Sequence, residues 1–180
     1  SPMLAVALLG WPVEAIPPEE AGRVIEGATA VCREAGIPLA GGHSIASAEP
    51  FFGLSVNGRV DVRHLKRNST AKEGDLLFLT KPLGTGIIGA ALKRDLVSEE
   101  HCREALDVMT SLNSAGERLG RLPAVHAMTD VTGFGLLGHL IEMAEGSGLT
   151  AELDLASVPV LKGAAVYADQ MCFPDNTYRN

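Results

Sequence analysis

The sequence predicts a fold of mixed α/β and α+β class, with an α/β unit at its start and a second domain after it. Apolar residues make up 46% of the 180 residues but aromatic residues only 4%, which suits closely packed layers of small aliphatic side chains. Apolar and amphipathic stretches also follow one another in the order strand, helix, strand within residues 1–44. The composition then turns small and polar, so we expect domains at 1–47 and 48–180.

The first expected elements are a strand and a helix. The apolar run Met3 to Leu9 predicts a buried strand, because turn-forming residues follow it directly. A helix is expected from Pro17, where prolines and glutamates suit a first turn, to Gly36, which can end it. Cys32 lies on the apolar stripe of this helix, so we expect its side chain in the core.

A second strand is expected over Ile37 to Ala40. It ends in Gly41-Gly42-His43-Ser44, where the glycines let a ligand approach the backbone and the next two side chains add hydrogen-bonding groups. The same pattern is common in ordinary turns after strands. On the residues alone, both a ligand site and a simple turn therefore stay open.

The remaining chain predicts a longer series of elements. Phe51 to Val62 alternates between apolar and polar residues and contains Asn57-Gly58, which favours a hairpin turn. Further strands are expected at Leu76–Thr80, Pro123–Met128 and Thr150–Leu155, and helices at Ile87–Arg94, Ser98–Leu119, Leu136–Ala144 and from Pro159 to Gln170.

Charge and cysteine content exclude several classes of protein. The formal net charge of -7 repels a phosphate backbone, so we expect no nucleic-acid partner. The apolar run near the start is too short to span a bilayer, so we expect no membrane association. The three cysteines, Cys32, Cys102 and Cys172, are widely spaced, which favours a reducing compartment and a cytoplasmic location.

The sharpest candidate site is the run from Met128 to His139. A carboxylate, Asp130, follows an expected strand and precedes a glycine-rich turn into a helix. Free N–H groups at a helix start attract phosphate oxygens, and a neighbouring carboxylate can hold Mg²⁺ against them. The alternative is that Asp130 merely caps the helix, and the residues alone do not decide between the two.

A second glycine pattern, Gly84 to Gly89, matches the G-x-G-x-x-G fingerprint of dinucleotide-binding folds. The helix expected after it is followed by another helix, so the strand that a βαβ unit requires is missing. We therefore expect no nicotinamide site here. The five histidines are scattered along the sequence without the spacing of metal ligands.

Several segments together resemble the selenophosphate synthetases. The Met128–His139 run is highly specific for that family, whereas Thr80–Gly86 is loosely shared with aminoimidazole ribonucleotide synthetases. The matching segments, which span essentially the whole chain in the family's order, are Leu9–Pro12, Gly41–Ile45, Glu49-Pro50, Thr80–Gly86, Met128–His139 and Thr177–Asn180.

The resemblance implies a fold and an activity. The fold is the second half of an aminoimidazole ribonucleotide synthetase-like amino-terminal α/β domain, followed by an α+β carboxy-terminal domain that is cut short at its end. The activity is ATP-dependent synthesis of selenophosphate from selenide and water, with release of AMP and phosphate. Mg²⁺ is the expected cofactor, and the expected assembly is a homodimer.

The resemblance also implies roles for particular residues. Asp130 resembles a magnesium ligand of the family, and Gly42, His43 and Ser44 resemble a stretch that contributes to the ATP site of the partner subunit. The family's catalytic cysteine or selenocysteine lies in an amino-terminal segment that this chain lacks, so no catalytic residue is assigned. We expect the isolated chain to be inactive. Ala46 departs from the acidic residue common in the family.

Two other functions remain as alternatives. One is a related ATP-dependent synthetase or kinase of the same superfamily, which the segment Phe134 to His139 disfavours. The other is a non-catalytic binding or dimerisation module. A dimer is also expected because an apolar strand at Met3 to Leu9 invites pairing along an exposed edge.

Overall fold

The computed structural model describes residues 1–174 and 177, so Tyr178 to Asn180 of the family-like terminal segment lie outside the described residues. The chain divides into two compact units, Ser1–Arg63 and His64–Asn180. Within the described residues, no helix has both the length and the apolar character needed to cross a membrane.

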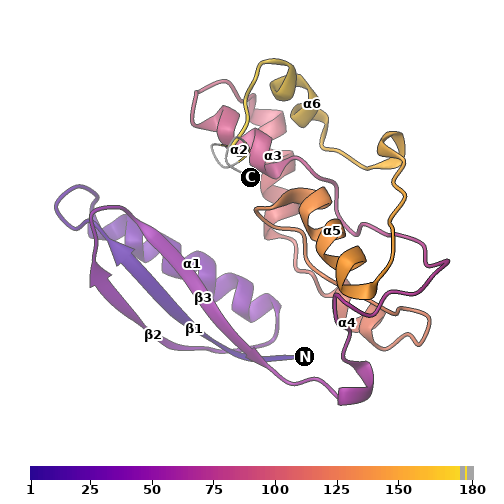
Figure 1. Cartoon of the computed structure of the whole chain (residues 1–180). Coiled ribbons are helices and arrows are strands. Elements are labelled where there is room, and N and C mark those ends of the chain that lie inside the picture. Colours follow the sequence, from indigo (N-terminus) through magenta and orange to yellow (C-terminus); the bar gives the residue numbers. More distant parts are fainter. Residues whose placement is uncertain (175–176, 178–180) are drawn as a thin grey trace. The chain divides into compact units, whose positions relative to one another are not determined.

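The first unit is a three-stranded sheet with one helix. It contains β1 (Pro2–Trp11), α1 (Pro18–Glu34), β2 (Leu39–Ala46) and β3 (Phe51–Gly58), shown in Figure 1. The strand order is β2-β1-β3, and β1 pairs parallel with β2 and antiparallel with β3. The strand, helix, strand unit expected from the sequence is therefore present, and α1 is its crossover connection.

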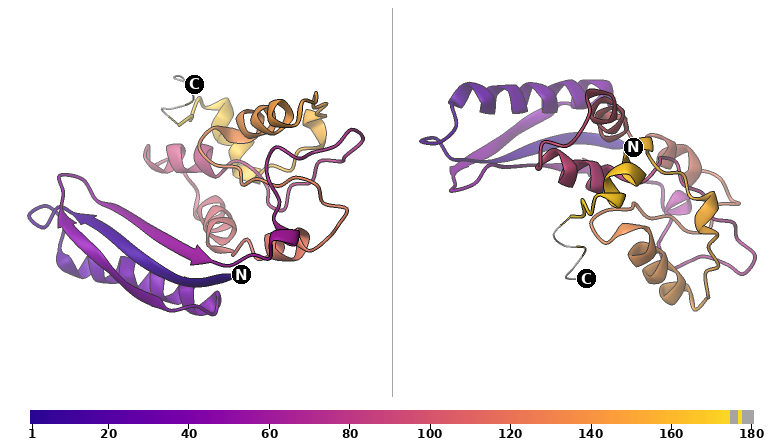
Figure 2. Two further views of the ribbon diagram at one scale, coloured as in Figure 1. Left: turned by 60° about the horizontal axis from the view of Figure 1, so that its bottom comes forward. Right: turned by 90° about the horizontal axis from the view of Figure 1, so that it is seen from above.

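One face of this sheet is covered by α1, which contacts β1 and β2 (Figures 1 and 2). Side chains alternate along a strand, so every second residue of β1 points toward the helix. Burying a leucine side chain there contributes on the order of 2 kcal/mol. Cys32 is buried, as the sequence predicts. The buried apolar residues of this layer are Ala5, Ala7, Leu9, Ala28 and Cys32.

The prediction of a hairpin turn at Asn57-Gly58 is wrong. Residues Phe51–Gly58 form one strand, and Asn57 pairs with Leu4 of β1. The backbone of Gly58 approaches that of Ser1 so closely that an added Cβ would lie 2.8 Å from the Ser1 carbonyl oxygen. The boundary expected between residues 47 and 48 falls inside this sheet, because β3 returns to pair with β1.

The second unit is mainly helical. Its core is formed by α2, α3, α6 and the segments beside them, and α2 contacts both α3 and α6. The helices are α2 (Thr85–Leu92), α3 (Glu99–Thr110), α4 (Ala115–Gly120), α5 (Gly135–Ser147) and α6 (Lys162–Asp169), with a short 3₁₀ turn at Leu155–Ser157; another 3₁₀ turn, Val62–His64, spans the boundary between the units. The buried cluster comprises Ile88, Ala91, Ala105, Leu161, Ala164, Tyr167 and Cys172.

The long helix expected from Ser98 to Leu119 is divided into α3 and α4. Its start is as predicted, because the Ser98 hydroxyl accepts a hydrogen bond from the His101 N–H at 3.3 Å. The break follows Thr110. Lys81 stabilises this end of α3, since its ammonium donates to the carbonyls of Val108 and Ser111.

The strands predicted in the second unit do not form a hydrogen-bonded sheet, so this part of the prediction is wrong. Among the described residues of this unit, strand pairing is limited to isolated bridges, Arg67 with Ala127 and Leu83 with Val160. Leu76 and Phe78 are 79% and 84% exposed. An extended segment becomes a strand only when a neighbour satisfies its backbone, and that condition cannot be read from local periodicity.

Candidate functional site

Asp130 lies in the loop that leads into α5. The helix begins at Gly135, its N-cap is Phe134, and no side chain caps it. The interpretation of Asp130 as a helix cap is therefore wrong. Asp130 is exposed, and its carboxylate makes no hydrogen bond or ion pair with the part of the chain that the structure describes. The carboxylate is thus free to bind a ligand.

The amino-terminal side of this loop is anchored to a distant segment. The Met128 N–H donates to the Arg67 carbonyl at 3.1 Å, and Arg67 bridges to Ala127. The Thr70 hydroxyl also donates to the carbonyl of His126 at 2.7 Å. Contacts from the segment 67–70 therefore fix the chain just before Asp130.

The carboxy-terminal side of the loop is anchored on α5. Thr132 Oγ1 lies 3.0 Å from His139 Nε2, and the Phe134 ring meets the His139 ring edge-on with centroids 6.0 Å apart. A Cβ on Gly138 would lie 2.8 Å from the Phe134 Cβ, so glycine is needed at this contact. Asp130 is thus held between two anchored segments.

The chemistry of Asp130 is compatible with Mg²⁺ but not with an all-protein metal cage. Within residues 1–174 and 177, no group of three or more His, Cys, Asp or Glu side chains could hold a metal ion. Mg²⁺ commonly keeps several waters and binds through one or two carboxylates together with substrate phosphates. One exposed carboxylate beside uncapped helix N–H groups fits part of such a site.

The segment Gly41 to Ser44 lies inside β2 and is not a loop after the strand. Paired residues share a face of a sheet, so Gly42 and Ser44 lie on the face of Ala7 and Leu9, which is the face toward α1. His43 lies on the opposite face. The structure therefore does not bring Gly42, His43 and Ser44 into one cluster of side chains.

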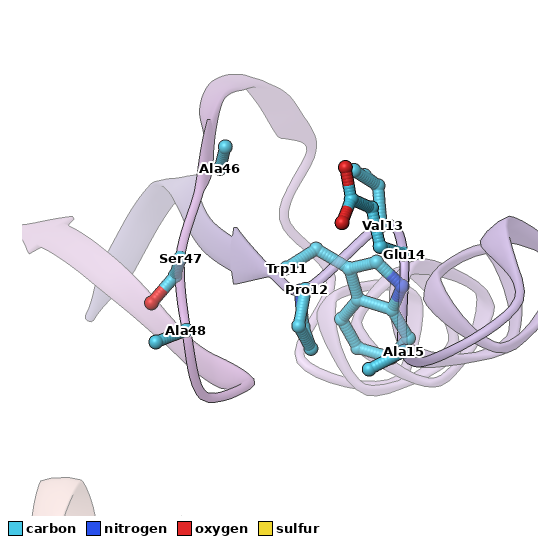
Figure 3. Close-up of a pocket in the computed structure, with 8 residues that line it drawn as sticks. All are labelled: Trp11, Pro12, Val13, Glu14, Ala15, Ala46, Ser47 and Ala48. Carbon is cyan, nitrogen blue, oxygen red and sulfur yellow. The ribbon is translucent and has the colours of Figure 1, made fainter.

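A pocket of about 410 Å³ lies where β1 and β2 end (Figure 3). The carboxyl ends of parallel strands are a frequent place for ligands in α/β folds. The Trp11 indole is fixed because its Nε1–H donates to the Ile16 carbonyl at 3.1 Å. Sequence reasoning did not predict this pocket. Its lining residues are Trp11, Pro12, Val13, Glu14, Ala15, Ala46, Ser47 and Ala48.

The fold also pairs Asp75 with His126, which sequence reasoning missed. Asp75 Oδ1 lies 2.8 Å from His126 Nδ1, and Asp75 Oδ2 accepts from the Lys72 N–H at 2.9 Å. The Lys72 hydrogen bond, followed by that of His126, lowers the pKa of Asp75 below its ordinary value. The two residues are 51 positions apart, so no local pattern could have revealed the pair.

The glycines at Gly84 to Gly89 have a packing explanation. Gly84 has a left-handed φ of +118°, and a Cβ on it would lie 2.4 Å from the Ala164 Cβ. The helix that follows, α2, is succeeded by α3 in the chain. Gly84 therefore allows close contact between the start of α2 and α6.

Two cysteines belong to the second unit. The Cys172 side chain is fully buried in its core. Its Sγ lies 3.8 Å from the Arg94 guanidinium. Cys102 is only partly buried.

Family models match both units. The model described as AIR synthase related protein, N-terminal domain, covers residues 1–60, and the corresponding C-terminal domain model covers residues 72–174. The chain belongs to the AIR synthase related protein family. This confirms the predicted fold class, with an amino-terminal α/β part followed by the family's carboxy-terminal domain.

Within that family, the chain is similar to selenide, water dikinases. It is 57% identical over 179 residues to the enzyme of Pseudomonas putida, and 55% identical to that of Pseudomonas aeruginosa. In both cases the match covers 99% of this chain and 52% of the relative. The chain therefore spans about half the length of the curated relatives it matches.

Solved structures support the same fold. The chain resembles thiamine-monophosphate kinase from Stenotrophomonas maltophilia with a TM-score of 0.77 at 19% identity, over 96% of this chain and 58% of the other. It resembles the enzyme of the same name from Aquifex aeolicus with a TM-score of 0.74 at 18% identity, over 98% and 60%. At this level of identity the likeness establishes the fold alone.

Proposed function

We propose that this chain forms part of a selenide, water dikinase, which makes selenophosphate from ATP, selenide and water and releases AMP and phosphate. The observation that supports this most is the 57% identity to the Pseudomonas putida enzyme over 99% of the chain. The proposed full-length protein contains this chain and, in addition, the part of the relatives' sequences that this chain does not cover. The isolated chain is proposed to be inactive.

Asp130 is proposed to supply one carboxylate to Mg²⁺ at the ATP phosphates. Its exposure and its lack of a partner among the described residues support the role. The loop beside it is held on both sides, so the carboxylate is positioned before a cation arrives. Asp130 would help to hold the ion, and Mg²⁺ bound there would neutralise the charge that develops on transferred phosphoryl oxygens.

Gly42, His43 and Ser44 are proposed to contribute to an ATP site, with His43 reaching across a homodimer interface. The support is that His43 lies on the sheet face opposite α1, beside Leu8. Several apolar side chains on that face are exposed in this unit, including Val6, Leu8, Ile45 and Phe51. Covering such a face with a second copy removes it from water. A cytoplasmic location is proposed with the assembly.

The strand at Met3 to Leu9 has no exposed edge that could pair with a second copy. That strand lies in β1, which is the centre of the sheet and pairs on both sides, so the edge-pairing reason was wrong. The open face of the sheet takes its place as the supporting observation.

A second candidate is another ATP-dependent kinase of the same superfamily. The observation in its favour is that the matched solved structures are thiamine-monophosphate kinases. A non-catalytic binding or dimerisation module is a third candidate. The observation in its favour is that Asp130 belongs to no cluster of metal-binding side chains among the residues that the structure describes.

The nucleotide product distinguishes these candidates. The full-length protein is incubated with ATP and Mg²⁺, with selenide or thiamine monophosphate added separately, and nucleotides are separated by chromatography. A dikinase forms AMP only when selenide is present. Formation of ADP with thiamine monophosphate would favour the kinase, and no turnover with either substrate would favour the binding module.

A further inference from the structure

His139 is a buried histidine with one nitrogen unaccounted for. It lies in the second turn of α5 and is 9% exposed. Its Nε2 meets Thr132 Oγ1 at 3.0 Å, whereas its Nδ1 has no hydrogen-bond partner among the described residues. Buried polar atoms are nearly always paired, so an orphaned ring nitrogen calls for an explanation.

Glu142, one turn further along α5, lies on the unpaired side of the ring. Its Oε2 is 3.7 Å from His139 Nδ1, and its Oε1 accepts a hydrogen bond from Asn68 Nδ2 at 2.9 Å. Asn68 follows Arg67, whose carbonyl accepts from the Met128 N–H at 3.1 Å. The same segment that anchors one end of the loop therefore also holds the carboxylate beside His139.

These contacts form a closed circuit around Asp130. From Met128 the circuit runs through Arg67 and Asn68 to Glu142, then to His139 and Thr132, and back along the loop. Both ends of the short segment that carries Asp130 are thus tied to one framework. A segment held in this way loses less conformational entropy when its carboxylate binds a cation.

We propose that His139 is a positioning residue for Asp130, acting through Thr132 and oriented by Glu142. This rests on the proposed function of Asp130 as a magnesium ligand. In the tautomer that carries the ring proton on Nδ1, toward the Glu142 carboxylate 3.7 Å away, Nε2 accepts a hydrogen bond from the Thr132 hydroxyl. Thr132 is then fixed in direction, and the backbone between it and Met128 sets where the Asp130 carboxylate points.

Two substitution pairs test the circuit. His139→Leu and Thr132→Val remove the hydrogen bond while keeping apolar volume, whereas His139→Gln and Thr132→Ser keep groups that can make it. In this chain, exchange of the hydrogen-bonded amides of Met128 and Gly135, at the two ends of the loop, is expected to accelerate in the first pair and to stay near that of the unaltered chain in the second. Fully accelerated exchange in both pairs would contradict the proposal.

Cation affinity gives the second readout. The affinity of the full-length protein for Mn²⁺ is measured with ATP present by electron paramagnetic resonance of the free ion. This affinity is expected to weaken about 10-fold in His139→Leu, the scale typical of outer-shell partners. His101→Leu is the matched control, because it removes another histidine hydrogen bond, His101 Nδ1 to Tyr167 OH at 2.9 Å. It should lower the melting temperature and leave Mn²⁺ affinity unchanged.

Asp130→Asn separates the two levels of the proposal. If Asp130→Asn weakens Mn²⁺ binding but His139→Leu does not, the role of His139 is wrong and that of Asp130 stands. If Asp130→Asn leaves binding unchanged, both fall. If His139→Leu has no further effect once Asp130 is replaced, the two residues act on one cation and the proposal is supported.

Discussion

Gly42 lies against Ala7 of the neighbouring parallel strand so closely that a Cβ on Gly42 would come within 2.4 Å of the Ala7 carbonyl oxygen. The two residues pair in the register of β1 and β2, on the face toward α1. The glycine in the Gly41-Gly42-His43-Ser44 segment is therefore required by strand packing, whatever ligand the segment contacts.

Gly42→Ala is accordingly expected to lower the free energy of unfolding by roughly 1–3 kcal/mol, because the added methyl group overpacks the contact with Ala7. The measurement is chemical denaturation followed by circular dichroism. Gly27→Ala is the matched control: it lies within α1 with nothing within 4 Å of an added Cβ, so it should stabilise the protein by about 0.5–1 kcal/mol. Equal stability of both variants would contradict this explanation of the glycine.

The contacts of Asp75 predict that part of the protein's stability is lost at acid pH. The pKa of Asp75 in the folded protein is lowered, first by the Lys72 N–H and then by His126, so the stabilisation is present above the ordinary carboxyl pKa of 3.8. It is lost as pH falls below 3.8 through the folded pKa. Asp75→Asn should therefore flatten the decline in melting temperature at acid pH, and an unchanged decline would count against the pair.

The glycine pattern at Gly84 to Gly89 is expected not to bind NAD or FAD. Gly84 serves the close contact with Ala164, and α2 is followed by another helix. Isothermal titration calorimetry with each dinucleotide is the measurement. Stoichiometric binding of either one, abolished by a substitution in this loop, would overturn the prediction.

The open face of the first unit predicts self-association. Light scattering of the chain should give a dimer, and Leu8→Glu should give a monomer, because a carboxylate would be buried in the interface. Leu106→Glu on α3 is the matched control, since Leu8 and Leu106 are 47% and 49% exposed. A monomer at high concentration of the unaltered chain, or equal disruption by both variants, would argue against the interface.

Local patterns predicted the elements whose stability is largely local. The strand at Met3 to Leu9 and the helix ending near Gly36 are confirmed, because apolar spacing and turn residues there agree with the fold. The return of β3 to β1, which pairs Asn57 with Leu4, was not predictable from a dipeptide that favours hairpins.

The candidate site divides in the same way. Asp130 was found from its position before a glycine-rich helix start, and that location before α5 is confirmed, while its role stays a prediction. The circuit through Asn68, Glu142 and His139 could not be predicted, because Asn68 and Glu142 are 74 positions apart and meet only in the folded unit. Only tertiary structure reveals such contacts.

The proposed activity of the whole protein predicts that this chain alone makes no selenophosphate. Phosphoryl transfer from ATP requires several positioned charges and a group that handles the nucleophile. Among the described residues Asp130 stands outside any cluster of metal-binding side chains, and Cys172 is fully buried. Selenide-dependent AMP formation by the chain alone that disappears in Cys172→Ser would show that the reactive centre lies here.

The most direct test follows selenophosphate by phosphorus NMR in the full-length protein with ATP, Mg²⁺ and selenide. We expect selenophosphate and AMP in equal amounts from the unaltered protein, and a loss of at least about 100-fold in Asp130→Asn, as when a charge-stabilising group is removed from an active site. Asp107→Asn, an exposed carboxylate on α3, should retain activity. Absence of selenophosphate from the unaltered, folded protein, or full activity in Asp130→Asn, would contradict the proposed function.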